Sequence, residues 1–284
     1  MKYTIKYATM LPMDKESFFI SLFKDKHIGD DGAVVGNLVY SKDLFCEDIH
    51  FKLAWMSLEQ ISYKAMLVNI SDAIVMNAKP LHALLGIKLP SSFTTSQMEE
   101  LAKGFFKASK EFNFDIIGGD TVAGDKLDIS ITLVSQTDKP TRRDDLKLGD
   151  LVAYTGELGS VKKDLNKLFN GEKLTNDSKF IKPQLKADFF YEASHLINGA
   201  LDISDGLSKD LSRLSKLNSV DFEFFCNFHE DILCSGEEYE ILFTFEEKNL
   251  DKIKKIAEKH NTNLTIFAKA IEGSYESQCK ENHF

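Results

Sequence analysis

The chain has 284 residues, 43% of them apolar, so it is long enough to bury a large core, and we expect two domains. Its formal net charge of −9 argues against a nucleic-acid surface, which would need a basic stripe. Residues 1–10 lack the apolar stretch of a signal peptide, and no later stretch approaches the roughly 18 apolar residues of a membrane span. We therefore predict a soluble, cytoplasmic protein that binds neither nucleic acid nor a membrane.

The cysteine pattern argues against a zinc site. The chain contains no Cys-x-x-Cys pair, and its cysteines are scattered: Cys46, Cys226, Cys234 and Cys279. We expect them to be reduced thiols, as is usual in the cytoplasm. The acidic charge does not exclude phosphate ligands, provided that metal ions lie between carboxylates and phosphates.

The first half of the chain predicts strands that alternate with helices. A helix over residues 14–24 precedes two strands, which are joined by a hairpin turn at Gly36-Asn37. A second helix opens at Ser57, with Gln60 as its capping-box partner, and stops at Pro80. The next elements are a strand over 81–89, an amphipathic helix around 98–112, a strand over 114–120 that breaks at its glycines, and an alternating strand over 127–136.

The polar, charged segment 137–145 marks the expected domain boundary, which gives domains over residues 1–137 and 138–284. In the second domain, Pro183 begins a helix, and Ser204 is the expected N-cap of a helix with a leucine stripe. The other elements are strands over 151–155, 221–225, 240–245 and 264–271, and helices over 161–169 and 250–259. Repeated strand–helix–strand crossings predict a mixed α/β (α+β) fold.

One apolar stretch carries polar and charged groups in its middle. Residues 64–80 include Asn69, Ser71 and Asp72. A buried carboxylate is costly unless it is paired or binds a cation. The same residue types return in the segment 202–205, Asp-Ile-Ser-Asp, which suggests two halves of one charged site. The alternative is that Asp72 caps a helix or belongs to a buried ion pair.

Acidic residues recur where predicted strands end or meet a glycine. Such residues converge on one edge of a sheet, and they are Asp30, Asp31, Asp43, Asp120, Asp202, Asp205, Glu237 and Glu238. Aspartates with few histidines suit Mg²⁺ or Mn²⁺ rather than zinc. A Mg²⁺ ion usually takes one or two carboxylates together with substrate phosphates, so this many aspartates suggests several ions. The glycines would let the backbone approach a phosphate closely.

Each feature also has a simpler interpretation. A Gly-Asp pair is commonly a turn, a lone histidine such as His50 is more often packed than bound to a ligand, and Arg142-Arg143 is typical of a solvated face. The chain lacks the P-loop, the protein-kinase glycine loop and the Gly-x-Ser-x-Gly elbow. The hypothesis of a metal-dependent phosphate site therefore depends on the whole set of acids.

Six motifs resemble, in order, those of the thiamine-monophosphate kinases, a family in the aminoimidazole-ribonucleotide-synthetase-like superfamily. They lie at residues 29–31, 43–51, 69–72, 118–121, 202–207 and 235–240, and together they span nearly the whole chain. The resemblance implies an N-terminal α/β domain whose sheet forms a homodimer barrel, and a C-terminal α/β domain that completes the site. It also implies ATP-dependent phosphorylation of thiamine monophosphate to thiamine diphosphate.

The resemblance further implies roles for individual residues. Several Mg²⁺ ions would be held by Asp31, Ser41, Asp43, Asp72, Asp120, Asp202 and Asp205. ATP would be contacted by Gly119, Asp120, Arg143 and Ser204, and thiamine monophosphate by His50 and Glu237. The nucleophile would be a phosphate oxygen, whose second pKa of about 6 leaves it largely dianionic at neutral pH, so no general base is expected.

The chain departs from the family pattern at a few positions. Lys42 stands where threonine is usual, Asp48 where a small residue is usual, and Glu238 where aspartate is usual. Three rival functions remain: another ATP-using member of the superfamily, a metal-dependent phosphohydrolase, and a non-catalytic nucleotide- or metal-binding scaffold. Product analysis separates them, because only the kinase would form thiamine diphosphate.

Overall fold

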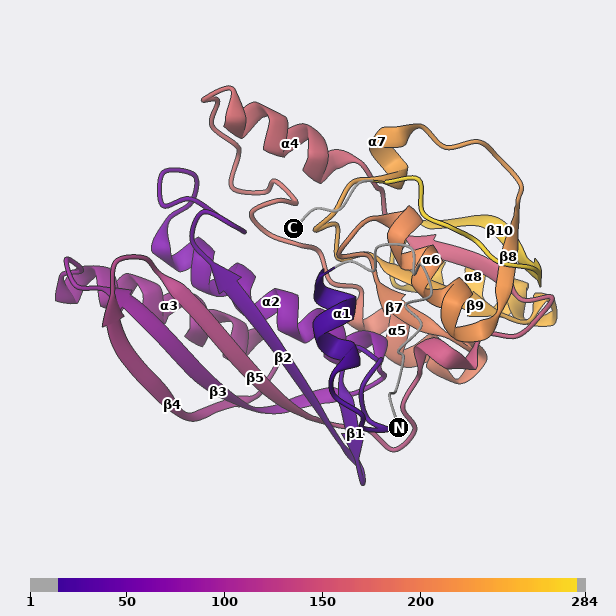
Figure 1. Cartoon of the computed structure of the whole chain (residues 1–284), viewed down its shortest axis with the longest axis horizontal. Helices are drawn as coiled ribbons and strands as arrows, with labels where there is room; N and C mark the ends of the chain where they lie inside the picture. Colours follow the sequence, from indigo (N-terminus) through magenta and orange to yellow (C-terminus); the bar gives the residue numbers. More distant parts are fainter. Residues whose placement is uncertain (1–14, 280–284) are drawn as a thin grey trace, which may run out of the picture.

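The computed structural model describes residues 15–279 and places two five-stranded sheets next to each other (Figure 1). The first sheet has the strand order β1-β2-β5-β3-β4. Its strands are β1 (Ala33–Val35), β2 (Leu38–Cys46), β3 (Lys79–Pro90), β4 (Asp115–Gly124) and β5 (Asp128–Gln136). The pair β3–β4 is parallel and the other neighbours are antiparallel. The β1–β2 hairpin turns at Gly36-Asn37, as predicted.

Two helices cover one face of the first sheet, α2 (Leu58–Val75) and α3 (Thr95–Glu111). Each begins with a capping box, Ser57 with Gln60 and Thr94 with Gln97, so that side chains satisfy the first free backbone N–H groups. Most side chains of α2 are buried, because it lies between α3, the first sheet and strand β7 (Ala200–Asp202) of the second sheet. This central helix therefore connects the two halves.

The second sheet has the order β7-β9-β6-β10-β8, and its neighbouring strands are antiparallel. Its other strands are β6 (Leu151–Thr155), β8 (Val220–Phe224), β9 (Ile241–Phe245) and β10 (Leu264–Glu272). The helices of this half are α4 (Ser160–Phe169), α5 (Ala187–Ala193), α6 (Leu207–Asn218), α7 (Glu230–Leu233) and α8 (Leu250–Lys259), and the short 3-10 turns are η1 (Arg143–Asp145), η2 (Ser194–Leu196) and η3 (Glu247–Asn249).

The hydrophobic core extends from one half into the other. One cluster joins Ile70 and Ile74 of α2 to Phe189, Phe190 and Phe243 of the second half. A second cluster packs α6 against the other face of the second sheet, through Leu207, Leu211, Leu214, Val152 and Leu242. The segment that separates the two sheets in the chain contains the predicted boundary at residue 137, and the domain limits stay a prediction.

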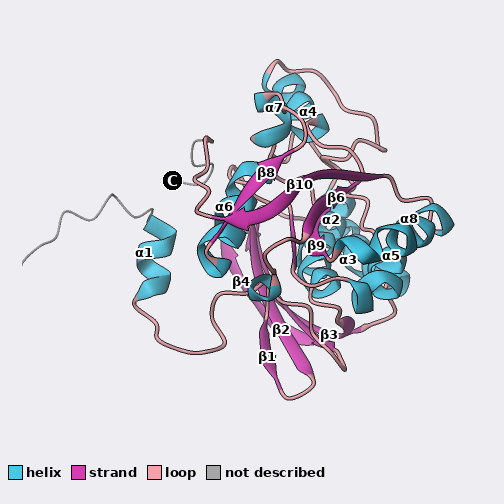
Figure 2. Cartoon of the chain, turned by 90° about the vertical axis from the view of Figure 1, so that its right-hand side faces the viewer, coloured by secondary structure: helices cyan, strands magenta, loops and turns pink. Residues whose placement is uncertain are grey.

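The first helix, α1 (Lys15–Ser21), stands apart from the body of the molecule (Figure 2). The large apolar side chains of this helix are exposed, as are the next two apolar residues along the chain: Phe18, Phe19, Ile20, Leu22 and Phe23. Residue 14, where we expected this helix to begin, lies outside the described residues.

Several local expectations were wrong. Strand β4 does not break at Gly118-Gly119, because hydrogen bonds to β3 carry it on to Gly124. Pro80 lies inside β3 rather than merely ending α2. Helix α5 begins at Ala187, not at Pro183. Ser204 does not cap α6, whose N-cap is Gly206 with a φ of +105°, a conformation that favours glycine.

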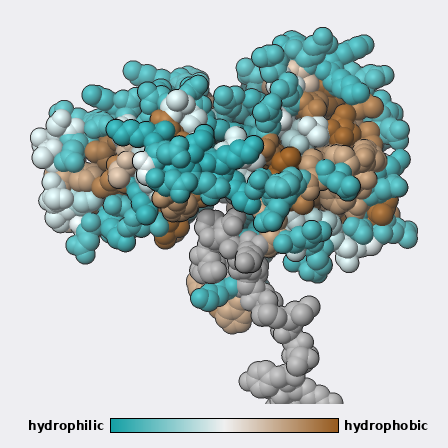
Figure 3. All heavy atoms as spheres, turned by 90° about the horizontal axis from the view of Figure 1, so that it is seen from above, coloured by the Kyte–Doolittle hydropathy of each residue, from teal (hydrophilic) through white to brown (hydrophobic). Residues whose placement is uncertain are grey.

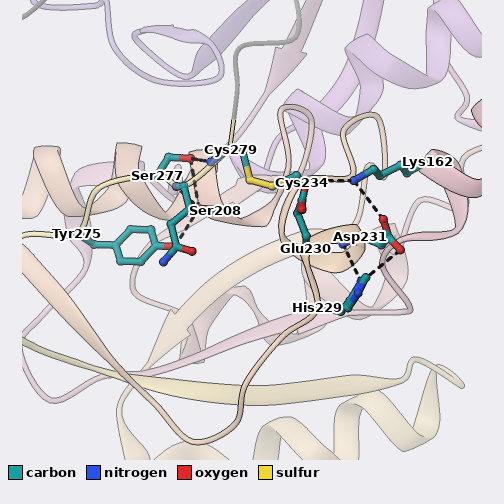
Figure 4. The surroundings of a disulfide bond; sticks show 10 residues. Lys162, Ser208, His229, Glu230, Asp231, Cys234, Tyr275, Ser277 and Cys279 are labelled. Carbon is teal, nitrogen blue, oxygen red and sulfur yellow. Dashed lines mark hydrogen bonds and ion pairs between the residues drawn. A yellow bond between two sulfur atoms is a disulfide. The ribbon is translucent and has the colours of Figure 1, made fainter.

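A disulfide joins Cys234 to Cys279, which corrects the expectation that all cysteines are reduced (Figure 4). It ties the C-terminal segment to the loop that follows α7. The same segment is held at α6, where Ser208 lies within hydrogen-bond distance of Tyr275 and Ser277. Cys46 and Cys226 are free thiols.

Hydrophilic side chains cover much of the face seen from above, with hydrophobic areas between them in both halves (Figure 3). No helix within residues 15–279 has the length and apolar character needed to cross a bilayer.

Candidate active site

An open cavity of about 750 Å³ lies where the two halves meet, and it contains most of the predicted site residues. They come from the loop before β1, from β2 and the turn after it, from α2, and from η1, β7 and loops of the second half. Ten of the twelve predicted residues line this cavity: Asp31, Ser41, Asp43, His50, Asp72, Arg143, Asp202, Ser204, Asp205 and Glu237. The structure therefore brings Asp72 and Asp202, from two distant stretches of the chain, into one cavity.

Three carboxylates from separate elements meet in the cavity. Asp31 precedes β1, Asp72 lies near the C-terminal end of α2, and Asp202 ends β7. One oxygen of each lies within 4.8 Å of the others. The side chain of Asp31 is only 2% exposed, and Asp202 is buried. Like charges so close together are unfavourable unless a cation or a proton neutralises them.

Burial and mutual repulsion disfavour the ionised form of this cluster. Burial, followed by the charges of Asp43 and Asp202, raises the pKa of Asp72 well above its usual value. Burial also raises the pKa of Asp43 to about 6, while a hydrogen bond with Asp72 partly offsets this. The buried atom Oδ2 of Asp43 has no hydrogen-bond partner among the described residues. This free oxygen and the three converging carboxylates are hard oxygen ligands of the kind that suits Mg²⁺.

Two arginines supply positive charge beside the acids. The Nε of Arg143 donates to Oδ2 of Asp31 at 3.0 Å, and its Nη2 bonds the other oxygen of the same carboxylate. Arg213 bonds Asp205 and also donates to Oδ1 of Asp210 at 2.8 Å. A planar guanidinium suits both carboxylates and phosphates, because it can donate two parallel hydrogen bonds.

Polar residues of α2 orient the acids and the neighbouring strand. The hydroxyl of Ser41 on β2 donates to Oδ1 of Asn69 at 2.6 Å, and Nδ2 of Asn69 donates to the carbonyl of Ile131 at 3.0 Å. Ser71 hydrogen-bonds Asp202 across the two halves. Asn69 and Ser71 therefore fix β2 and β7 relative to α2.

His50 and Glu237 lie in the wall of the same cavity. The backbone N–H of Cys46 donates to Nδ1 of His50 at 3.0 Å, so the neutral ring carries its proton on Nε2. Oε2 of Glu237 accepts a 2.7 Å hydrogen bond from the ammonium of Lys64. Both residues are positioned by groups outside the acidic cluster.

Gly119 and Asp120 are not in the cavity of this chain. Gly119, on edge strand β4, is in register with Leu85, Ile131 and finally Asp43, so three strand spacings, about 14 Å, separate it from the acids. Asp120 shares its row with the 60% exposed Leu44, on the face opposite α2. Within one chain, Asp120 cannot join the other six predicted ligands.

Sequence reasoning missed Lys64, Arg213 and Tyr239. Arg213 and Tyr239 line the cavity, and Lys64 contacts Glu237. A lysine in the apolar stretch 64–80 was a signal, because a buried ammonium requires a partner. Arg213 lies eight residues after Asp205, and no sequence pattern predicts the contact between them. Lys42, a departure from the family pattern, also lines the cavity, and its ammonium donates to Ser130 and Thr132.

Comparison with known proteins places this chain in a family. The sequence model named "AIR synthase related protein, N-terminal domain" matches residues 29–137. The thiamine-monophosphate kinase of Bacillus subtilis (strain 168) is 30% identical over 262 residues, which are 81% of this chain and 81% of that protein. The thiamine-monophosphate kinase of Buchnera aphidicola subsp. Schizaphis graminum is 32% identical over 263 residues, 82% of this chain and 81% of that protein.

The fold agrees with a solved structure, "AaThiL complexed with AMPPCP and TMP". The TM-score is 0.85, and the match covers 98% of this chain and 100% of that chain. At 24% identity, this likeness shows the fold alone. The two relatives described above are 30% and 32% identical over four-fifths of their own length. The chain belongs to the thiamine-monophosphate kinase family.

Proposed function

We propose that this protein transfers the terminal phosphoryl group of ATP to thiamine monophosphate and forms thiamine diphosphate. The observation that carries the proposal is the convergence of Asp31, Asp72 and Asp202 beside Arg143 in one cavity, in a chain whose relatives are thiamine-monophosphate kinases. Two polyanions must meet for this reaction, and their repulsion is the main obstacle to it. An acidic cluster that holds cations, together with an arginine, is suited to removing that obstacle.

The residues that would hold Mg²⁺ are the cavity's aspartates, Asp31, Asp43, Asp72, Asp202 and Asp205, with Ser41 beside them. When bound, Mg²⁺ would screen the phosphate charges and stabilise the leaving ADP. Three of these carboxylates lie within reach of one ion, and several ions are proposed because more acids line the cavity than one ion needs.

The chain's own residues would bind and orient the two substrates. Arg143 can donate in parallel to a phosphate group as it does to Asp31. Ser204 would offer its hydroxyl to ATP from the same loop as Asp205. The Nε2–H of His50 and the carboxylate of Glu237 would contact thiamine monophosphate, whose thiazolium ring is a permanent cation. The attacking phosphate oxygen is already anionic at neutral pH, so no general base is required.

We propose that the working unit is a homodimer in which a second copy supplies Gly119 and Asp120. The face of the first sheet opposite α2 exposes apolar side chains, among them Tyr40, Leu44, Leu84 and Val122. Asp120 lies on this open face. If the sheet of a second copy packs against the face, Asp120 can reach the acidic cluster of that copy. Light scattering on the purified protein should give about twice the chain mass of 32.1 kDa.

Steady-state kinetics tests the substrate pair directly. Thiamine diphosphate should accumulate with ATP, Mg²⁺ and thiamine monophosphate, and phosphate release without the acceptor should stay at background. ATP hydrolysis that is independent of the acceptor would instead support a phosphohydrolase. The cytoplasmic location stays a prediction, consistent with ATP as co-substrate.

A further inference from the structure

The ammonium of Lys64 is buried in the middle of the molecule and pairs with a residue of the cavity wall. Its side chain is 0% exposed, and Nζ lies 2.7 Å from Oε2 of Glu237. It also lies 3.9 Å from the ring centre of Phe180 and 5.6 Å from that of Phe45. Among residues 15–279, Glu237 is the one carboxylate within ion-pair distance of Lys64. Burying an ammonium this deeply is costly, so a role beyond packing is worth testing.

The partner of Lys64 lies in a tightly held loop. The backbone N–H of Glu237 donates to the carbonyl of Ser204 at 2.7 Å, and that of Tyr239 donates to the carbonyl of Ile203 at 2.9 Å. Glu237 and Tyr239 have φ values of +55° and +50°, which side-chain-bearing residues adopt rarely. The loop therefore runs along the segment that carries Asp202 and Asp205, and the Glu237 carboxylate is fixed beside the acids.

Lys64 reaches this loop from the same helix that supplies Asp72. Lys64, Val68 and Asp72 follow one stripe of α2 at a spacing of four residues, and Val68 and Asp72 line the cavity. Lys64 uses one carboxylate oxygen of Glu237, which is 20% exposed and lines the cavity. From the core outward, the buried ammonium of Lys64 is therefore followed by the carboxylate of Glu237, which faces the cavity where the substrate would bind.

We propose that Lys64 is a positioning residue that holds the Glu237 carboxylate for the cationic ring of the substrate. The inference rests on the proposed function, since it assigns Glu237 to the thiazolium-bearing acceptor. Lys64 cancels the charge repulsion between Glu237 and the nearby aspartates and limits the carboxylate to one orientation. The residue therefore governs acceptor binding, whereas Arg143 and the aspartates govern phosphoryl transfer.

A second lysine offers a matched control. Lys179 pairs with Glu238 at 2.9 Å and with Glu240 at 2.8 Å, so it holds the same loop, yet none of these three residues lines the cavity. Its side chain is 13% exposed. Loss of Lys179 removes a largely enclosed cation that holds the same loop, and it leaves the pairing of Glu237 unchanged.

The experiment compares Lys64→Met, Glu237→Gln, their double variant and Lys179→Met with the wild type. Methionine keeps the length of lysine and packs well against aromatic rings, so Lys64→Met should fold. We expect Lys64→Met and Glu237→Gln to raise KM for thiamine monophosphate by about ten- to a hundredfold, the range that misplacement of a binding group causes. The KM for ATP and kcat at saturating acceptor should stay within about twofold of the wild type.

In the double variant, KM for thiamine monophosphate should be no higher than in the more impaired single variant, because both changes remove the same interaction. Lys179→Met should lower the melting temperature and leave KM for the acceptor unchanged. A Lys64→Met enzyme with unchanged acceptor KM, or with equal rises in both KM values, would overturn the inference while the wild-type activity upholds the proposed function. A wild type that forms no thiamine diphosphate would overturn both together.

Discussion

Asp43 on β2 and Asp72 on α2 share a hydrogen bond in the cavity wall, although both are acids. Two carboxyl groups can share a hydrogen bond only when one of them is protonated. Burial is the largest cause of the raised pKa of each residue, and the charge of Asp43 is the next cause for Asp72. Close, buried acids of this kind destabilise the ionised, cation-free protein, and a bound cation, as proposed above, would relieve that cost.

The first prediction concerns pH and the stability of the cation-free protein. Burial raises the pKa of Asp43 from 3.8 to about 6, so the folded state binds this proton more tightly than the unfolded state. The stabilising contribution is complete below pH 3.8 and is lost as the pH rises through about 6. Relative to wild type, Asp43→Asn should therefore gain up to about 3 kcal/mol in free energy of unfolding between pH 4 and pH 7.

Urea unfolding in EDTA at several pH values measures this difference. Asp251→Asn on α8 is the control, since Asp251 is exposed and does not line the cavity. A stability difference between wild type and Asp43→Asn that stays constant with pH would contradict the assignment of the raised pKa.

The second prediction concerns the acids and turnover. Asp72→Asn and Asp205→Asn should each reduce kcat by at least about a hundredfold, because in the proposed mechanism the loss of a metal ligand removes several kcal/mol of charge stabilisation in the transition state. Asp72→Asn should also melt at a higher temperature than wild type in EDTA, since a repelled buried charge is removed. Mg²⁺ should raise the melting temperature of the wild type but not that of Asp72→Asn.

Calorimetry with and without Mg²⁺, alongside product formation, measures both effects. Near-normal turnover in both purified variants would show that these acids do not take part in the reaction.

The third prediction concerns sharing of the site between two copies. Suppose that Asp120 of one copy completes the acidic site of the other. A hybrid dimer of an Asp72→Asn chain and an Asp120→Asn chain then has one intact site, because the Asp120→Asn chain keeps its own Asp72 and receives Asp120 from its partner. Random reassociation of equal amounts should restore about a quarter of wild-type activity. A mixture of Asp72→Asn with Asp202→Asn should restore none, because both residues belong to the cluster of a single chain.

Activity after co-refolding of the two variants gives the result. A mixture of Asp72→Asn and Asp120→Asn that stays inactive although hybrid dimers form would place Asp120 outside the shared site.

The fourth prediction concerns the Cys234–Cys279 disulfide, which spans 45 residues. In the chain-entropy model, closing a loop of this length contributes about 4 kcal/mol to folding stability. A reducing agent should therefore lower the melting temperature of the wild type. Cys279→Ser should melt at the lower temperature with or without reductant, and Cys226→Ser should behave as wild type, because Cys226 is a free, exposed thiol. Equal melting curves with and without reductant would show that the bond does not form.

Elements that depend on local chemistry could be predicted from the sequence. The capping box of Ser57 and Gln60 marks the start of α2, and the Gly36-Asn37 turn gives the first hairpin, because the interactions join residues close in sequence. The expected break at Gly118-Gly119 failed because pairing with β3 holds the glycines extended. Ser204 failed as an N-cap because its loop pairs with residues 237–240 instead.

The site residues could be predicted from ordered motifs and residue chemistry, and most of them do line one cavity. The contacts that position them were not predictable, because they join residues far apart in the chain. Lys64 and Glu237 are 173 residues apart, and Arg143 and Asp31 are 112 apart. A single sequence contains no signal for such pairs. The exposed position of Asp120 on an edge strand likewise follows from strand register alone.

The most direct test of the central claim is an assay of the purified protein with ATP, Mg²⁺ and thiamine monophosphate, scored by chromatography. Free thiamine in place of the monophosphate is the control acceptor. We predict that thiamine diphosphate forms from the monophosphate and that free thiamine gives no phosphorylated product. Formation of ADP without thiamine diphosphate, or no reaction while ATP remains bound, would contradict the proposed function.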